Sequence, residues 1–255
     1  MNLADPADVA RAVEELAANA WPASIVQIVD GWRLRATPGI DARRSNSVLP
    51  TGGSSAIDLD DKLALVDAFY AARELPVRFQ MSPAAVPADL DELLAERGLG
   101  IEAPVDVMVA DLAEVDASAT GGTAVEISDE PEDVWLDTML GITARGERWL
   151  LRSAVLDRIG PSARYAWVPD GDRAIAVGMG VVERGWLGIF SMATVPDRRR
   201  RGHARSVLHA LAEFGLTAGA TRAYLQTERG NATSHALYEG AGFRTAYGYH
   251  YRTRR

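Results

Sequence analysis

Apolar residues recur along this chain either every three or four positions, as in a helix, or at every second position, as in a strand. A change from one spacing to the other marks the boundary of a predicted element. Near the start, Val9, Val13 and Leu16 lie three or four positions apart, which predicts an amphipathic helix. Asp5 precedes this helix as a cap, and Pro6 suits its first turn. The further predicted helices span 60–72, 88–98, a segment capped by Ser128 that ends near Gly141, 203–218 and 231–242.

Strand signals lie between these helices. The runs 24–29 and 32–36 flank Asp30 and Gly31, a dipeptide typical of a hairpin turn. The segment 103–112 alternates apolar and polar residues, as a half-buried strand does. The further predicted strands span 45–50, 77–81, 124–127, 163–168, 173–182, 186–195, 223–227 and 244–252. The predicted fold class is therefore α/β (α+β), with mixed sheets flanked by helices.

The order of elements in the first half of the chain returns in the second half. A constant offset aligns Val48 with Thr194 and Phe79 with Leu225, and a two-residue gap later aligns Leu94 with Tyr238. This similarity predicts a tandem duplication, and two unrelated α/β segments are the alternative.

The predicted domain boundary follows from composition. The stretch 114–123 is small, polar and Gly-rich, which is typical of a linker. We therefore predict an N-terminal domain at 1–113 and a C-terminal domain at 124–255.

Composition narrows the classes of function. The chain has 255 residues, a net charge of -8 and no cysteine, which excludes disulfides, thiolate metal sites and a cysteine nucleophile. Its longest apolar run, 174–182, is far shorter than the roughly 20 residues that a membrane helix needs. The first residues carry no secretory signal pattern, so we expect a cytoplasmic protein that binds no membrane. The acidic balance also argues against a nucleic-acid partner.

One basic cluster stands out against this acidic background. Four consecutive arginines, 198–201, follow a predicted strand and precede Gly202, Ala204 and an amphipathic helix. The first N–H groups of a helix have no partner within the helix and lie at the positive end of its dipole. Small residues let the backbone approach a ligand closely, and arginines add positive charge. The stretch is therefore chemically suited to a pyrophosphate.

Two motifs resemble those of the GNAT superfamily of acyl-CoA-dependent N-acyltransferases. The stretch RRRGHA, 199–204, fits the family signature [Gln/Arg]-x-x-Gly-x-[Gly/Ala]. The stretch NATSHALYEGAGF, 231–243, resembles the second signature, with its alanine displaced by one position. The resemblance covers 125–252. It implies a tandem GNAT whose C-terminal repeat is active, using acetyl-CoA as co-substrate and no metal.

The resemblance also implies a reaction and its partners. The reaction is direct acetyl transfer in a ternary complex to the primary amine of a small molecule or peptide. A non-catalytic acyl-CoA-binding sensor is the alternative. The protein would be a monomer or a homodimer.

The roles of individual residues follow from the same resemblance. Tyr238 corresponds to the general acid that protonates the departing thiolate, and a core tyrosine with a satisfied hydroxyl is the alternative. Asn231 corresponds to a residue near the pantetheine arm. His203 is read as a neighbour of solvent or adenosine, not as a base. The remaining predicted cofactor-binding residues are Met192, Ala193 and Thr194 for pantetheine, and Arg199, Arg200, Arg201, Gly202 and Ala204 for the pyrophosphate.

The first half departs from this pattern. Leu94 stands at the position of the tyrosine, and the segment matching the basic loop is acidic, which predicts a degenerate repeat without a CoA site. A polar segment at 43–47, with Arg43, Arg44, Asn46 and Ser47, either binds substrate or is an exposed strand edge.

The general base is left open by the sequence. Its candidates are Glu183, Asp137 and Glu147. Trp135, Trp149 and Trp167 either line an acceptor cleft or pack in the core.

Overall fold

The computed structural model describes residues 5–53, 56–115, 123–143, 148–160 and 162–254, of which 143, 148 and 149 are described for the backbone alone. None of the helices in these ranges is both long and apolar enough to span a bilayer. The helices are α1 (Pro6–Ala20), α2 (Leu59–Ala71), α3 (Leu90–Glu96), α4 (Asp133–Thr143), α5 (Arg148–Ala154), α6 (His203–Thr217) and α7 (Ala232–Glu239). The strands are β1 (Ile25–Val29), β2 (Trp32–Ala36), β3 (Val48–Leu49), β4 (Arg78–Met81), β5 (Gly100–Asp111), β6 (Glu126–Ser128), β7 (Ala163–Asp170), β8 (Arg173–Glu183), β9 (Trp186–Thr194), β10 (Arg222–Glu228) and β11 (Arg244–Thr253).

The chain forms two compact units whose limits differ from the predicted 1–113 and 124–255. Unit 1 contains 1–106, 228–230 and 246–255, and unit 2 contains 107–227 and 231–245. Strands β5 and β11 each contribute residues to both units. Most of the predicted linker, 116–122, lies outside the described residues.

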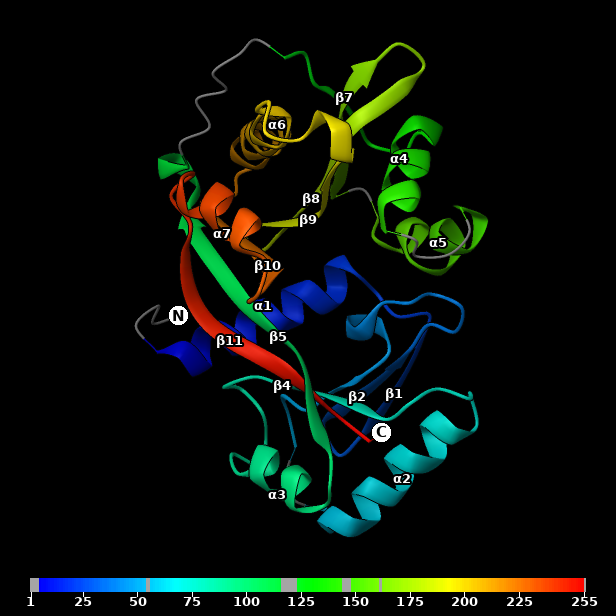
Figure 1. Cartoon of the computed structure of the whole chain (residues 1–255). Helices are drawn as coiled ribbons and strands as arrows, with labels where there is room; N and C mark the ends of the chain where they lie inside the picture. Colours follow the sequence, from blue (N-terminus) through cyan, green and yellow to red (C-terminus); the bar gives the residue numbers. More distant parts are fainter. Residues whose placement is uncertain (1–4, 54–55, 116–122, 144–147, 161, 255) are drawn as a thin grey trace. The chain divides into compact units, whose positions relative to one another are not determined.

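Unit 1 is a sheet whose two faces differ in chemistry. Its strands lie in the order β1-β2-β3-β4-β11-β5, of which β11 and β5 contribute only their unit 1 residues. Trp32, Phe79 and their apolar neighbours form one face, which packs against Val66 and Tyr70 of α2 and Leu94 of α3. Helix α1 covers the other, more polar face (Figure 1). The aligned position of Tyr238 is thus occupied in unit 1 by an apolar core residue.

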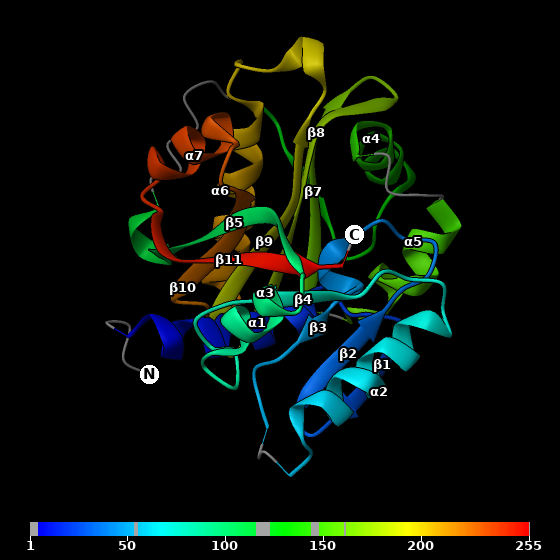
Figure 2. The same ribbon diagram turned by 60° about the horizontal axis from the view of Figure 1, so that its bottom comes forward.

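Unit 2 is built around three long strands. The order is β10-β9-β8-β7-β6, with β9 and β10 parallel and the other neighbouring pairs antiparallel. Helix α6 packs on one face of this sheet through Val207, Leu208 and Leu211, and α4 lies on the other face (Figures 1 and 2). The predicted mixed α/β arrangement is therefore present in this unit.

Each unit contains the same series of elements. In unit 1, β3 is followed by α2, the parallel strand β4, α3 and β5. In unit 2, β9 is followed by α6, the parallel strand β10, α7 and β11. This order is consistent with a tandem duplication, which stays a prediction.

The structure differs from the sequence predictions at helices α4 and α5. Ser128 does not cap α4: its hydroxyl accepts the N–H of Glu130 at 3.0 Å, and the helix begins only at Asp133. Pro131 explains the delay, because the residue before a proline is disfavoured in the helical region. Helix α5 was not predicted from the sequence.

Candidate active site

The site begins where two parallel strands diverge. Strands β9 and β10 are paired from Trp186 with Arg222 as far as Ile189 with Leu225. Beyond these pairs β9 continues to Thr194. The end of β9 therefore has one edge that is not covered by β10.

A β-bulge on β9 interrupts its pairing with β8 shortly before the strand ends. Val177 of β8 pairs with Ala193 and Met179 pairs with Phe190, so β9 holds one extra residue between them. Ser191, inside this interval, has a φ of +53°, which is unusual for a residue other than glycine. The N–H of Val195 bonds to Ile175 of β8, so by alternation the backbone groups of Thr194 point away from β8, and Met192 lies inside the bulge.

Gly178 of β8 accommodates the bulge from the other side. A Cβ at this position would lie 2.5 Å from the sulfur of Met192 and 2.7 Å from a methyl group of Val207. Its carbonyl accepts a 2.9 Å hydrogen bond from the indole N–H of the fully buried Trp135. Trp135 therefore has a packing and hydrogen-bonding role beneath the site.

The basic loop turns sharply into α6. A short 3₁₀ turn, Pro196–Arg198, is followed by two left-handed residues, Arg200 with φ +59° and Gly202 with φ +87°. The N–H of Ser206 bonds to the Gly202 carbonyl at 3.0 Å. The N–H groups of residues 203–205 precede this first helical bond, so they lie at the positive end of the helix without an intrahelical partner.

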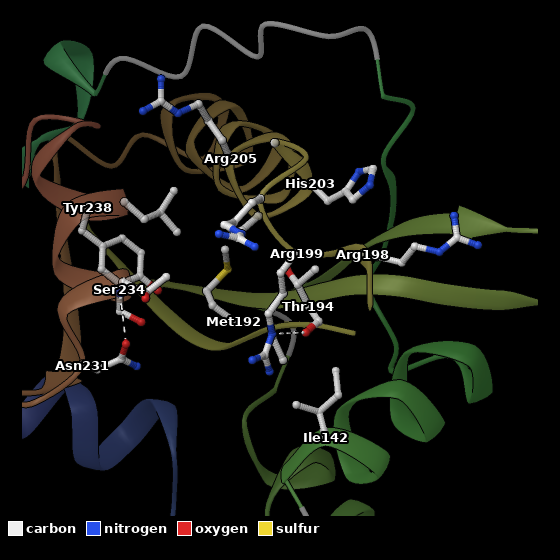
Figure 3. Close-up of a pocket in the computed structure, with 16 residues that line it drawn as sticks. Ile142, Met192, Thr194, Arg198, Arg199, His203, Arg205, Asn231, Ser234 and Tyr238 are labelled. Atoms are coloured by element: carbon white, nitrogen blue, oxygen red, sulfur yellow. Dashed lines mark hydrogen bonds between the residues drawn. The ribbon is translucent and has the colours of Figure 1, made fainter. Parts of the chain in front are cut away.

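The arginines of the loop have different surroundings (Figure 3). Arg199 folds back, and its Nε donates to the Thr194 carbonyl at 3.1 Å. Arg198 points away and forms a 2.9 Å ion pair with Asp170. Within the described residues, the side chains of Arg200 and Arg201 have no hydrogen-bond or ion-pair partner. Two of the four charges are therefore uncommitted.

Helix α7 brings Tyr238 to the same place. Its N-cap is Asn231, whose Oδ1 accepts the N–H of Ser234 at 3.1 Å. At the other end Gly242, with φ +94°, reverses the chain, so that the N–H of Phe243 bonds to the Tyr238 carbonyl at 2.9 Å. The two rings then pack edge to face, 6.0 Å apart. The Gly-Phe pair of the motif therefore fixes the Tyr238 ring.

These elements enclose one pocket of about 680 Å³ (Figure 3). Tyr238 and all the predicted cofactor-binding residues except Arg201 line it. The lining residues that were not among the predicted cofactor-binding or catalytic residues are Ile142 of α4, Arg198, Arg205, Thr233, Ser234 and Leu237. The last three share helix α7 with Tyr238, so helical spacing was the signal that could have identified them.

Besides Arg200, the side chains of Tyr238 and His203 bring polar atoms to the pocket that have no partner among the described residues. The Tyr238 side chain is 6% exposed, and burial alone raises the pKa of its hydroxyl well above the ordinary value. That phenol is therefore neutral at physiological pH. The Nδ1 of His203 is buried and has no hydrogen-bond partner among the described residues. Each side chain thus has a polar atom available to a ligand.

Two of the three candidates for the general base, Glu183 and Asp137, do not line this pocket. Glu183 begins the β8–β9 hairpin opposite Trp186, six residues or about 20 Å along the strand from Met192. Asp137 is exposed on α4 and does not line the pocket, and Glu147 lies outside the described residues. Within the described part of the chain, no Asp or Glu lines this pocket.

The polar segment of unit 1 has structural roles. Arg43 forms a 2.8 Å ion pair with Glu102. Asn46 is buried, and its Oδ1 accepts the N–H of Thr37 at 2.7 Å. Ser47 accepts a 2.9 Å hydrogen bond from the buried Arg35. An exposed strand edge is therefore wrong for Asn46 and Ser47.

Arg35 belongs to a buried polar row that crosses the sheet of unit 1. Its guanidinium donates to Gln80 at 2.7 Å, Gln80 donates to Glu14 of α1, and Tyr247 donates to the same carboxylate at 2.8 Å. Burial raises the pKa of Glu14, although the Tyr247 hydrogen bond and the charge of Arg35 act in the opposite direction.

Comparison with known proteins shows the family to which this chain belongs. The family described as "Probable histone acetyltransferase Rv0428c C-terminal" matches residues 7–252. The protein named "Uncharacterized N-acetyltransferase YobR" from Bacillus subtilis (strain 168) is 29% identical over 97% of this chain and all of its own length. The "Probable histone acetyltransferase Rv0428c" of Mycobacterium tuberculosis is also 29% identical, over 92% of this chain and 70% of its own.

A solved structure supports the fold. The "GCN5-related N-acetyltransferase from Kribbella flavida" has a TM-score of 0.71 and covers 96% of this chain and 95% of its own, at 13% identity. The predicted GNAT fold is thereby confirmed.

Proposed function

Because this chain belongs to the family described as "Probable histone acetyltransferase Rv0428c C-terminal", we propose that it transfers an acetyl group from acetyl-CoA to a primary amine by direct attack in a ternary complex. GNAT acetyltransferases use acetyl-CoA, and both curated relatives are named as acetyltransferases. The acceptor is a small-molecule or peptide amine.

One observation carries the proposal: a single pocket joins the open edge of β9, the N-terminus of α6 and the ring of Tyr238. The free N–H groups of residues 203–205 and the uncommitted charge of Arg200 suit a pyrophosphate. The backbone groups of Met192 and Thr194 suit the amides of a pantetheine arm. His203 Nδ1 is a further partner for the nucleotide end.

Tyr238 acts on the departing sulfur. A thiol has a pKa near 8.5, and the pKa of this buried phenol lies well above that value. Complete proton transfer to a free thiolate is therefore uphill. The hydroxyl instead stabilises the developing thiolate by donating a hydrogen bond, which is strongest when charge has accumulated on sulfur.

The acceptor amine loses a proton during the reaction, and the described lining of the pocket supplies no carboxylate to accept it. An amine that is already neutral when it attacks, and then releases its proton to water, needs no carboxylate in the pocket. The same observation favours the alternative function, an acyl-CoA-binding sensor that performs no chemistry, and an activity assay separates the two.

The assay measures thiol release from acetyl-CoA in the presence of an amine panel. The panel contains diamines, amino sugars and lysine peptides, including histone tail peptides because of the relatives' names. We expect at least one acceptor to raise thiol release well above the amine-free rate, with an N-acetyl product in the mass spectrum. Background release with the whole panel, together with tight acetyl-CoA binding, would support the sensor.

The cofactor site has its own test. Gly202→Glu places a side chain and a negative charge in the pyrophosphate loop, and we expect it to abolish the thermal shift that acetyl-CoA produces. Gly219→Glu is the matched control, because Gly219 follows the same helix and has a similar φ of +82° with no atom near its Cβ position. An unchanged shift in Gly202→Glu would remove the pyrophosphate assignment.

A further inference from the structure

Strand β1 is the outer strand of the unit 1 sheet and exposes unusually apolar side chains. It reads Ile-Val-Gln-Ile-Val, and its only sheet neighbour is β2 in the described part of the chain. Ile25, Val26 and Ile28 are 37%, 54% and 69% exposed. No charged residue or proline interrupts the strand, whereas isolated edges are usually protected by one of these.

The register shows which backbone groups face outward. The N–H of Arg35 bonds to the carbonyl of Ser47, the residue before β3, so Arg35 faces away from β1. Its opposite residue Val26 therefore points its N–H and C=O away from β2. By the same alternation Gln27 is bonded to Leu34, and Ile28 points outward like Val26. The outer edge of β1 is thus a short template for another strand.

The sequence of the strand is complementary to itself. When two copies are antiparallel about Gln27, Val26 of one lies opposite Ile28 of the other, and Gln27 faces Gln27. These are the same residues whose N–H and C=O groups point outward, so each Val26–Ile28 pair exchanges both main-chain hydrogen bonds. Apolar β-branched pairs of this kind stabilise neighbouring strands.

We propose that β1 is a homodimer interface, in which a second copy of this chain adds its own β1 antiparallel about Gln27. The proposal depends on unit 1 and not on the acetyl-transfer assignment. A contact of two five-residue strands is small, so the dimer should be weak and reversible, with a dissociation constant of order 1–100 µM.

Disulfide trapping tests the register. The chain contains no cysteine, so Gln27→Cys has a single possible partner, the same residue of the second copy. In a non-hydrogen-bonded antiparallel pair the two Cα atoms lie about 4.5 Å apart, within the range of a disulfide. The control is Leu65→Cys, a residue of α2 that is 43% exposed. We expect only Gln27→Cys to form a covalent dimer rapidly under mild oxidation, and equal rates would overturn the proposal.

Sedimentation tests the association itself. We expect the average mass of the wild type to rise towards that of a dimer between about 1 and 100 µM, and Ile28→Lys to remain monomeric because two charges would lie in an apolar pairing. Leu216→Lys, at a 47% exposed residue of α6, is the control that should still dimerise. A monomeric wild type, or a dimer of Ile28→Lys, contradicts the proposal. A circular dichroism spectrum and a thermal midpoint close to those of the wild type show that Ile28→Lys is folded.

Discussion

Removing one oxygen atom, by Tyr238→Phe, separates the chemical role of this residue from its packing role. The ring lies in the core of unit 2, against Phe243 at 6.0 Å, and the substitution keeps that contact. The hydroxyl has no hydrogen-bond partner among the described residues, so its loss leaves no protein group unsatisfied. We therefore expect the free energy of unfolding to change by less than about 1 kcal/mol.

The expected loss of turnover is much larger. Losing one hydrogen-bond donor to a charge that develops in the transition state typically costs about 10²–10³-fold, and water in an open pocket can replace part of this. A drop of at least about tenfold, equal to roughly 1.4 kcal/mol of transition-state stabilisation, is our threshold. Because the pKa of Tyr238 is raised by burial, the ratio of wild-type to variant rates should be constant from about pH 6 to pH 9.

The assay is thiol release with the acceptor found in the amine panel, with acetyl-CoA affinity measured separately by calorimetry. Affinity should stay within a few-fold. Tyr165→Phe is the matched control, because Tyr165 is also buried with a raised pKa but does not line the pocket. If Tyr238→Phe turns over as fast as Tyr165→Phe, then Tyr238 only packs, and the catalytic assignment is refuted.

Three further predictions concern the surroundings of the site and unit 1. Gly178→Ala should destabilise the protein by about 1–3 kcal/mol and weaken acetyl-CoA binding, because the new methyl group would overlap Met192; Gly100→Ala, with no atom near its Cβ position, is the control in thermal and calorimetric scans. Calorimetry of the whole chain should give one acetyl-CoA site per chain, and two equivalent sites would contradict a degenerate first repeat. The folded-state pKa of Glu14 is raised, so its contribution to stability is complete below the unfolded value near 4.5 and is lost as pH rises through the folded value. The difference in thermal midpoint between wild type and Glu14→Gln should therefore fall as pH rises from about 4.5, and a flat difference would contradict this assignment.

Much of the local structure could be predicted because its causes are local. The caps, hairpin dipeptide and periodicity placed the helices other than α5 and the strands. The GNAT resemblance carried by the basic loop and the α7 motif identified ten of the 16 residues that line the pocket. These features depend on residues within a few positions of one another. The predicted start of α4 after Ser128 was wrong, because Pro131 disfavours a helical conformation at the residue before it and the helix begins at Asp133.

Tertiary structure decided the features that depend on distant partners. Periodicity does not reveal the β9 bulge, because the extra residue at Ser191 is defined only against β8. Asp170, 28 residues earlier, removes Arg198 from the uncommitted charges. Glu14 is a residue type that is rarely buried, yet it is buried here because its partners Gln80 and Tyr247, 66 and 233 residues away, reach it in the fold. The sequence by itself determines which groups the chain can offer at each position. Only the folded chain determines which of them are buried, paired or left for a ligand, because desolvation and hydrogen bonding depend on neighbours in space.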